Sequence, residues 1–265
     1  MNATMVFEGI RDGNFHKGGI RCLQLFDLEA SYFSKLRCDV ERLCETERPS
    51  NVSDAKHVTN WTRPRGTVLQ FSLLNRSGRY DDFADDHDMS CLGKTFHGAT
   101  TYLVLANFVA AFPHMVNCRI NMMGPGARLS PHEEQAIIRT RTGSVATRTR
   151  FHLPLVTNPL AELTLDEAVY HLPAGKVYFV NHGCVHSAHN RGKQDRIHLV
   201  WDMLLTYEAF QLMFSEEPCP GPLSRVSCDE QVPHPLRNEK MGAYLQLPRL
   251  VTLDEAKHIE WCDVQ

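Results

Sequence analysis

The chain has 265 residues, of which 43% are hydrophobic and 22% are charged, and its formal net charge is −3. This composition is typical of a globular protein and excludes a wholly disordered chain. The near-neutral balance, without a basic block, argues against nucleic acid and anionic membranes as partners. The N-terminus lacks the basic-then-apolar order of a secretory signal, and the nine cysteines form no CxxC pair. We therefore expect a cytoplasmic protein with reduced thiols.

The first half of the chain contains two helix-like segments and one polar loop. Residues 26–46 place apolar side chains at helical spacing, which predicts a helix. Residues 68–75 are β-prone and end at a turn-like Asn-Arg-Ser-Gly sequence. The aspartate-rich residues 81–90 predict an exposed loop, and an alternative interpretation makes them a lid that recognises an ammonium group. Residues 99–112 predict a second helix.

After Pro113 the pattern changes to short segments rich in β-branched and aromatic residues, separated by Gly/Pro turns. Several short strands at regular spacing predict a β-sandwich or barrel. Beyond Ser215 the chain becomes Pro-rich and ends in a predicted helix, residues 253–262. We expect a single domain over 1–265, with a helical N-terminal region (1–60), a β core (61–210) and a C-terminal extension (211–265) that packs on the core.

A candidate metal site lies in the β region. His132 and Glu134 are two residues apart, so in an extended strand their side chains point to the same side. His186 follows a β-prone run 54 residues after His132 and is the candidate third ligand. Two imidazoles and one carboxylate with open positions form the facial triad of non-haem Fe(II) oxygenases. His182 and His189 lie close to His186 in the sequence and remain alternatives for the third ligand.

Two further segments place positive and imidazole side chains on one strand face. Arg148, Arg150 and His152 share one parity, and Arg196 with His198 repeats the pattern. Arginines inside a barrel need anions to compensate them, and a guanidinium matches a carboxylate bidentately. An arginine pocket beside a metal with open positions therefore suits a keto-acid dicarboxylate.

Four ordered motifs over about residues 115–205 carry a family resemblance: NMMGPGARLSPHEE, RTRFHLPLV, LPAGKVYFVNHGCVHSAHN and RIHLVWD. With them the chain resembles the aspartyl/asparaginyl β-hydroxylases, and in its motifs it is most similar to the bacterial proline cis-4-hydroxylases. The resemblance implies a mainly β protein with flanking helices, built on a double-stranded β-helix (jelly roll, cupin-like). It also implies Fe(II) as the metal, with 2-oxoglutarate as cosubstrate and O2.

The resemblance assigns roles to nine residues. It implies metal ligands at His132, Glu134 and His186, with Glu134 in place of the aspartate in the PHxD motif of the proline hydroxylases. Arg196 matches the arginine that holds the distal carboxylate of 2-oxoglutarate, His152 matches a histidine near its metal-bound end, and Asn121 takes the position of a cosubstrate-binding serine. Arg148 and Arg150 match arginines that contact a substrate carboxylate, and Arg119 falls where related enzymes have another basic residue.

These observations predict a 2-oxoglutarate-dependent dioxygenase that hydroxylates an unactivated C–H bond of a free amino acid or an amino-acid-derived small molecule. A hydroxylase of Asp or Asn residues in peptides or proteins is one alternative. A cupin-like metal enzyme or a binding barrel that does not use 2-oxoglutarate is the other. Arg196, ten residues after His186, favours the first interpretation because a cupin-like enzyme does not need it.

Overall fold

The computed structural model describes residues 20–52, 65–86, 88, 93–112, 114–132, 134, 137–139, 145–214 and 221–231. The strands are β1 (Cys22–Leu28), β2 (Ser50–Asn51), β3 (Val68–Ser72), β4 (Met115–Met123), β5 (Arg128–His132), β6 (Ile137–Arg139), β7 (Val145–Val156), β8 (Ala161–Leu165), β9 (Ala168–Tyr170), β10 (Lys176–Val180), β11 (His186–Asn190), β12 (Arg196–Leu204) and β13 (Leu223–Glu230). The helices are α2 (Ala30–Thr46), α3 (Leu103–Ala110) and α4 (Tyr207–Phe214).

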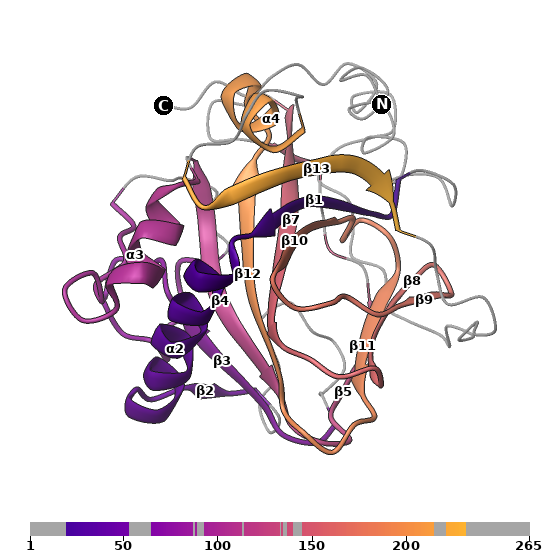
Figure 1. Ribbon diagram of the computed structural model, residues 1–265, viewed down its shortest axis with the longest axis horizontal. Helices are drawn as coiled ribbons and strands as arrows, with labels where there is room; N and C mark the ends of the chain where they lie inside the picture. The colour runs from indigo at the N-terminus through magenta and orange to yellow at the C-terminus, as the bar shows by residue number, and fades with distance from the viewer. Residues whose placement is uncertain are drawn as a thin grey trace.

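The described strands form two antiparallel sheets that enclose a cavity. The strand order of the larger sheet is β13-β1-β10-β7-β12-β4-β3-β2. A further short strand, β6, pairs with β7 and lies outside this linear order. The order of the smaller sheet is β5-β11-β8-β9. In Figure 1 the smaller sheet lies on the right, across from the long strands β4, β12 and β7. The predicted fold, a double-stranded β-helix that is mainly β with flanking helices, is confirmed.

The two faces of β12 show why the larger sheet has both a core and a polar interior. Leu199, Trp201 and Met203 point into the main hydrophobic core, whereas Arg196 and Val200 have the opposite parity and line the cavity. All nine residues of the strand are buried, because the helices cover one face and the smaller sheet covers the other. The larger sheet therefore presents charged side chains to the cavity between the two sheets.

The helices cover the outer face of the larger sheet (Figure 1). α2 buries Leu36, Val40 and Leu43, which lie on one helical face at spacings of four and three residues. The predicted helix over 26–46 begins later, at Ala30, because residues 26–28 belong to β1, which is paired on both sides. The second predicted helix, over 99–112, occupies residues 103–110.

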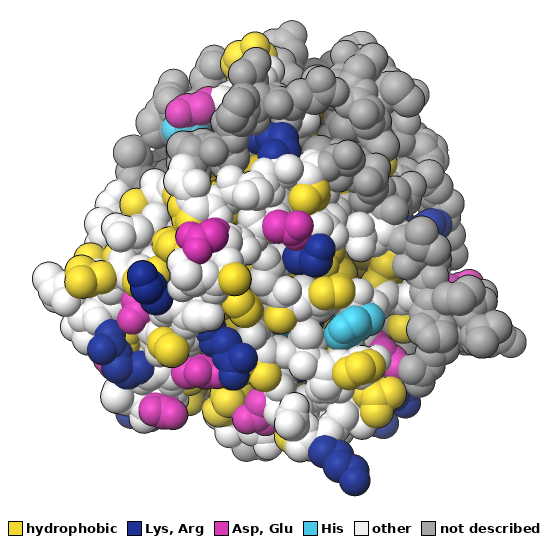
Figure 2. All heavy atoms as spheres, in the orientation of Figure 1, with side chains coloured by type: hydrophobic (Ala, Val, Ile, Leu, Met, Phe, Trp, Pro, Cys, Tyr) yellow, Lys and Arg dark blue, Asp and Glu magenta, His cyan; other side chains and the backbone are white. Residues whose placement is uncertain are grey.

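The larger sheet extends beyond the region expected to form the β core. β1 pairs with β10, and β13 pairs with β1, so strands from both flanking regions complete the sheet. The predicted C-terminal helix over 253–262 lies outside the described residues. Among the described helices, none has the length and apolarity needed to cross a membrane. On the face shown in Figure 2, acidic, basic and apolar side chains are interspersed.

Candidate metal and cosubstrate site

Two histidines face each other on neighbouring strands of the smaller sheet. His132 on β5 and His186 on β11 are paired across the sheet, and their ring centroids are 4.3 Å apart. The Nδ1 of His132 lies 2.7 Å from the carbonyl oxygen of Ser130, and the Nδ1 of His186 lies 2.9 Å from that of Cys184. Because a carbonyl only accepts, each Nδ1 carries the proton, which directs Nε2 toward a metal.

Glu134 completes a cluster of three ligand types. Its Oε1 lies 3.9 Å from the Nε2 of His132, and the ligand atoms of His132, Glu134 and His186 all lie within 4.8 Å of one another. Among the described residues this is the only group of three or more His, Cys, Asp or Glu side chains that could hold a metal ion. Neither His182 nor His189 belongs to it, so the geometry favours His186 as the third ligand.

The cavity between the sheets brings together nearly all of the predicted site residues. Its lining includes the three candidate ligands together with Arg119, Asn121, Arg150, His152 and Arg196. Arg148 does not line the cavity, but its Nη2 lies 3.2 Å from the Oε2 of Glu134. The two ends of the cavity differ in charge, because the cross-strand register groups the polar residues.

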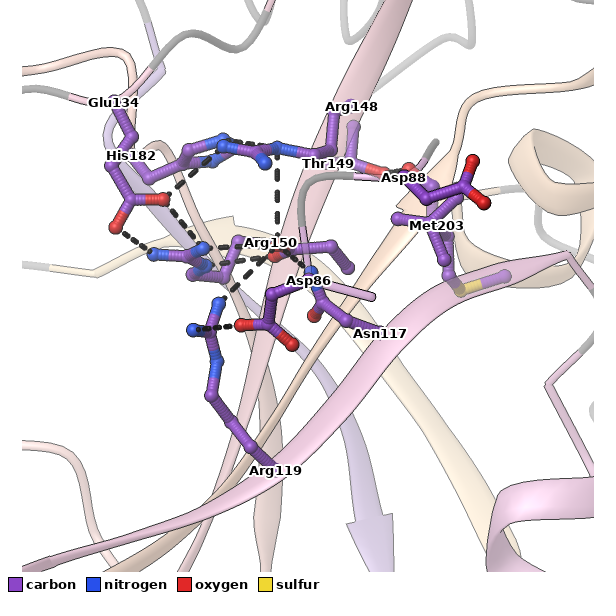
Figure 3. A network of polar contacts seen from close by, with 12 residues as sticks. Asp86, Asp88, Asn117, Arg119, Glu134, Arg148, Thr149, Arg150, His182 and Met203 are labelled. Atoms are coloured by element: carbon purple, nitrogen blue, oxygen red, sulfur yellow. Dashed lines mark hydrogen bonds and ion pairs between the residues drawn. The ribbon is translucent and has the colours of Figure 1, made fainter. Parts of the chain in front are cut away.

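At one end, arginines and carboxylates alternate (Figure 3). Arg150 lies opposite Asp202 in the β7·β12 register and binds it through two hydrogen bonds of 2.8 and 2.9 Å. The same guanidinium binds Glu134 at 2.7 and 2.6 Å. Arg119 donates to Asp86 at 2.9 Å and lies 3.6 Å from Asp202. These contacts hold the pKa of Asp202 below its usual range, despite the burial that opposes this shift.

At the other end, Arg196 has no carboxylate partner among the described residues. Its Nη1 lies 3.3 Å from the sulfur of Met123, and its Nη2 donates to the Nδ1 of His198 at 3.0 Å. Burial lowers the pKa of Arg196 to about 10. The Oδ1 of Asn121, on the lining of the same cavity, has no hydrogen-bond partner among the described residues. A buried guanidinium of this kind fits one carboxylate of a small dianion.

Burial also keeps the imidazoles in and beside this cavity neutral. It is the largest cause of the lowered pKa of five histidines, and for His186 it brings the pKa to about 3, assisted by nearby His132. The other four are His132, His152, His182 and His198. A metal needs neutral imidazoles as ligands, so His132 and His186 are ready to bind one without losing a proton.

Sequence reasoning missed three side chains of these networks. Asp202 shares the parity of Arg196, so strand alternation alone places it inside the barrel. His182 was considered only as a metal ligand, but its Nε2 lies 3.4 Å from the Nε of Arg148 and its side chain lines the cavity. Asp86 was expected on an exposed loop, yet only 11% of its side chain is exposed because it pairs with Arg119. No periodic pattern in the sequence signals that contact.

Residues 94–205 match the family model "Aspartyl/Asparaginyl beta-hydroxylase". This part of the chain is therefore similar to the aspartyl/asparaginyl β-hydroxylases. The matched range includes the three candidate metal ligands and the arginines of both ends of the cavity. It confirms the predicted family resemblance and the prediction that the chain is an enzyme, a 2-oxoglutarate-dependent dioxygenase. No curated protein matches the chain.

Several solved structures are similar to this chain. The α-ketoglutarate-dependent epimerase SnoN from nogalamycin biosynthesis is 15% identical, with a TM-score of 0.46 and coverage of 85% of this chain and 93% of SnoN. A Pseudomonas putida prolyl-4-hydroxylase is 13% identical, with a TM-score of 0.40 and coverage of 76% and 98%. HygX from Streptomyces hygroscopicus, with nickel, 2-oxoglutarate and hygromycin B bound, is 8% identical, with a TM-score of 0.41 and coverage of 71% and 84%.

The residues present fit the cofactors of this enzyme class, which are Fe(II), 2-oxoglutarate and O2. Two neutral imidazoles and a carboxylate are the ligand set of non-haem Fe(II) oxygenases, and Arg196 fits a carboxylate of 2-oxoglutarate. When bound, the ferrous ion and 2-oxoglutarate supply the activation of O2, with 2-oxoglutarate converted to succinate and CO2. The protein supplies the orientation of these groups and the exclusion of water.

Proposed function

We propose that this protein hydroxylates an unactivated C–H bond of a free amino acid or an amino-acid-derived small molecule. In this proposal His132, Glu134 and His186 bind the ferrous ion, and Asn121, His152 and Arg196 bind 2-oxoglutarate. Arg119, Arg148 and Arg150 form the part of the cavity that attracts the substrate. The observation that carries the proposal is the charge balance at that end of the cavity.

The arginine-rich end favours one negative charge on the substrate. Three guanidiniums lie there, each with a side chain at most 8% exposed, against the carboxylates of Asp86 and Asp202. Glu134 contacts two of these guanidiniums as well, but its charge also serves the ferrous ion once that ion is bound. Among the described residues, one positive charge is then left without a compensating carboxylate, and a buried charge of this kind is costly unless an anion pairs with it.

Arg119 is the best-placed residue to meet a substrate carboxylate. It lines the cavity, and its Nε has no hydrogen-bond partner among the described residues. Because Asp86 already binds the Nη1 of Arg119, the substrate carboxylate would approach through the remaining donors. A single carboxylate beside an enclosed cavity suits an amino acid better than a long peptide, whose α-carboxylate lies far from most of its C–H bonds.

The test is succinate release from 2-oxoglutarate by the Fe(II)-loaded protein, measured with a panel of free amino acids, N-acylated amino acids and short peptides. We expect substrate-dependent succinate with at least one free amino acid, and mass spectrometry of that product should show one added oxygen atom. His132→Ala is the inactive control. His171→Ala, whose imidazole lies 3.3 Å from the backbone carbonyl of Ala161 and not in the metal cluster, is the matched control that should stay active.

Each other outcome changes the assignment. Turnover of peptides or folded proteins without turnover of free amino acids would replace the proposal with a peptidyl or protein hydroxylase. Oxidation of a small molecule that needs the metal but not 2-oxoglutarate would indicate a cupin-like enzyme. Succinate release that survives His132→Ala would overturn the metal site itself.

A further inference from the structure

Arg150 is a heavily hydrogen-bonded side chain of the cavity. Its guanidinium makes four hydrogen bonds, two to Glu134 at 2.7 and 2.6 Å and two to Asp202 at 2.8 and 2.9 Å. A guanidinium has five N–H donors, so one donor is left for any further ligand. The family resemblance implies that Arg150 contacts substrate, but these bonds indicate that most of its donors bind the protein's own carboxylates.

The two carboxylates that Arg150 holds differ in position. Asp202 lies on β12 in the middle of the larger sheet, is fully buried and also accepts a hydrogen bond from Asn117 at 2.9 Å. Glu134 follows β5, at the end of a strand of the smaller sheet. Arg150 on β7 therefore connects a candidate metal ligand beside the smaller sheet to a fixed anion on β12 of the larger sheet. Figure 3 shows its guanidinium beside the carboxylate of Glu134, above Asp86 and Arg119.

The length of the Glu134 side chain explains why its hydrogen bonds to Arg150 would matter for metal binding. Glutamate has one more rotatable bond than the aspartate of the PHxD motif, so a ligand at position 134 has more orientations to lose when it binds a metal. A bidentate guanidinium removes that freedom because both carboxylate oxygens are held in one plane. Outer contacts that orient a ligand in this way contribute to metal affinity.

We propose that Arg150 is a positioning residue for Glu134, and that it orients this carboxylate toward His132 and His186 by tying it to Asp202. The proposal rests on the assignment of Glu134 as a metal ligand in the proposed function. It predicts that the shape of the side chain at position 150 controls metal affinity, and that its positive charge alone does not. A lysine at that position keeps the charge but cannot hold two carboxylates bidentately.

The experiment compares Arg150→Lys with Arg119→Lys by Mn(II) binding, followed through the EPR signal of free Mn(II), with no cosubstrate or substrate present. Arg119 is the matched control because it lies in the same cavity and contacts Asp86 and Asp202, whereas no contact joins it to Glu134 in the described network. We expect R150K to weaken Mn(II) binding by about 10-fold or more, the effect typical of losing an outer contact to a ligand. R119K should stay within about 3-fold of the wild type.

A double-mutant cycle separates positioning from general damage to the barrel. In the Glu134→Gln background, R150K should cost no further Mn(II) affinity, because its effect acts through the Glu134 carboxylate. An equal loss with and without Glu134, or an equal loss in R119K, would overturn the proposal. Unchanged Mn(II) binding by folded R150K would overturn it too.

Two further measurements keep the test decisive. If R150K does not fold, Asp202→Asn replaces it, since this change leaves Arg150 in place but removes its fixed anchor; unchanged Mn(II) binding by D202N would then overturn the proposal. If the wild type itself binds no Mn(II), the metal site and the proposed function fail together. Wild-type binding of one equivalent, with R150K unaffected, removes only the positioning role.

Discussion

The Nη2 of Arg196 donates to the Nδ1 of His198 at 3.0 Å, and this neutral imidazole takes the place that a carboxylate usually has beside a buried arginine. Only 3% of Arg196 is exposed, so its charge is held in the barrel wall at a cost in stability. A ligand carboxylate that reaches Arg196 would offset that cost. The buried charge of Arg196 therefore lowers the stability of the ligand-free protein and raises its affinity for an anion.

Arg196→Met separates these two effects. Charge-assisted hydrogen bonds contribute about 1.5–3 kcal/mol, so the dissociation constant of 2-oxoglutarate should rise by about 10- to 150-fold. The free energy of unfolding of the ligand-free protein should stay equal or increase, because a buried unpaired charge is removed. Calorimetric titration of the Mn(II)-loaded protein and urea denaturation measure the two quantities.

Arg191→Met provides the control for this pair of measurements. Arg191 also carries a guanidinium with a nearby acceptor, the Oε2 of Glu162 at 2.9 Å, but its side chain is 38% exposed. Its replacement should leave 2-oxoglutarate affinity unchanged. Retention of wild-type affinity by R196M would show that Arg196 does not hold the cosubstrate.

The buried imidazoles predict that stability depends on pH in the mildly acidic range. Burial lowers the pKa of five histidines in or beside the cavity below the ordinary value of 6.5, for His186 to about 3. Between those values the unfolded chain binds protons that the folded chain does not, so stability is fully present above pH 6.5 and is lost as the pH falls toward 3. Each histidine contributes at most about 1.4 kcal/mol per pH unit.

Urea denaturation of the metal-free protein at pH 7.5 and 5.5 measures this slope. His198→Asn should reduce the slope by up to one histidine's share, because the amide oxygen still accepts from Arg196 but takes up no proton. His97→Gln, which removes an exposed imidazole, is the control variant. Equal stability at the two pH values would contradict the prediction.

Strand alternation explains why much of the site could be predicted from the sequence. Two-residue spacing places His132 and Glu134 on one side of the chain and Arg148, Arg150 and His152 on one face of β7, and neither inference needs knowledge of the partner strands. Predicting which side chains on different strands meet does require knowledge of the strand pairing. Asp202 meets Arg150 through a register that shifts at an irregularity between Ile197 and His198, and no local pattern fixes that shift.

The parts that could not be predicted are contacts between segments without periodicity. Asp86 and Arg119 are 33 residues apart, and the polar sequence around Asp86 predicts an exposed loop. The strand over residues 26–28 was expected to be helical because the apolar positions of β1 continue into α2 without a break. Pairing of β1 with both β10 and β13 decides the boundary, and this pairing is tertiary.

Substitutions of Trp201 test whether the outer face of β12 contributes to stability alone and not to ligand binding. Its indole is fully buried, lies 5.6 Å from the ring of Phe151 and meets Phe108 edge-on at 5.4 Å. Trp201→Ala should therefore destabilise the protein by about 3–5 kcal/mol in urea denaturation. Trp201→Phe should cost much less, because the indole Nε1 has no hydrogen-bond partner among the described residues to lose. Folded W201F should bind 2-oxoglutarate like the wild type, and weaker binding would contradict the separation of the two faces.

Lys94 connects the loop that carries Asp86 to the barrel. Only 7% of this residue is exposed, and its ammonium donates to the backbone carbonyls of Asp85, Asp88 and Val116. Val116 lies on β4, the strand of Arg119, so the same lysine fixes the loop and the strand that it contacts. All three protons of the ammonium have acceptors, which offsets the cost of burying its charge.

Lys94→Met should release this connection. It leaves three carbonyl oxygens without their donor and should cost about 1–3 kcal/mol of stability. Once the loop is loosened, the Asp86–Arg119 pair should weaken, so the KM of the substrate should change while the affinity for 2-oxoglutarate at the far end of the cavity stays the same. Lys176→Met, which removes a partly exposed lysine paired with Asp27, is the control. Equal changes in substrate KM and in 2-oxoglutarate affinity would indicate that Lys94 supports the whole barrel and not the loop alone.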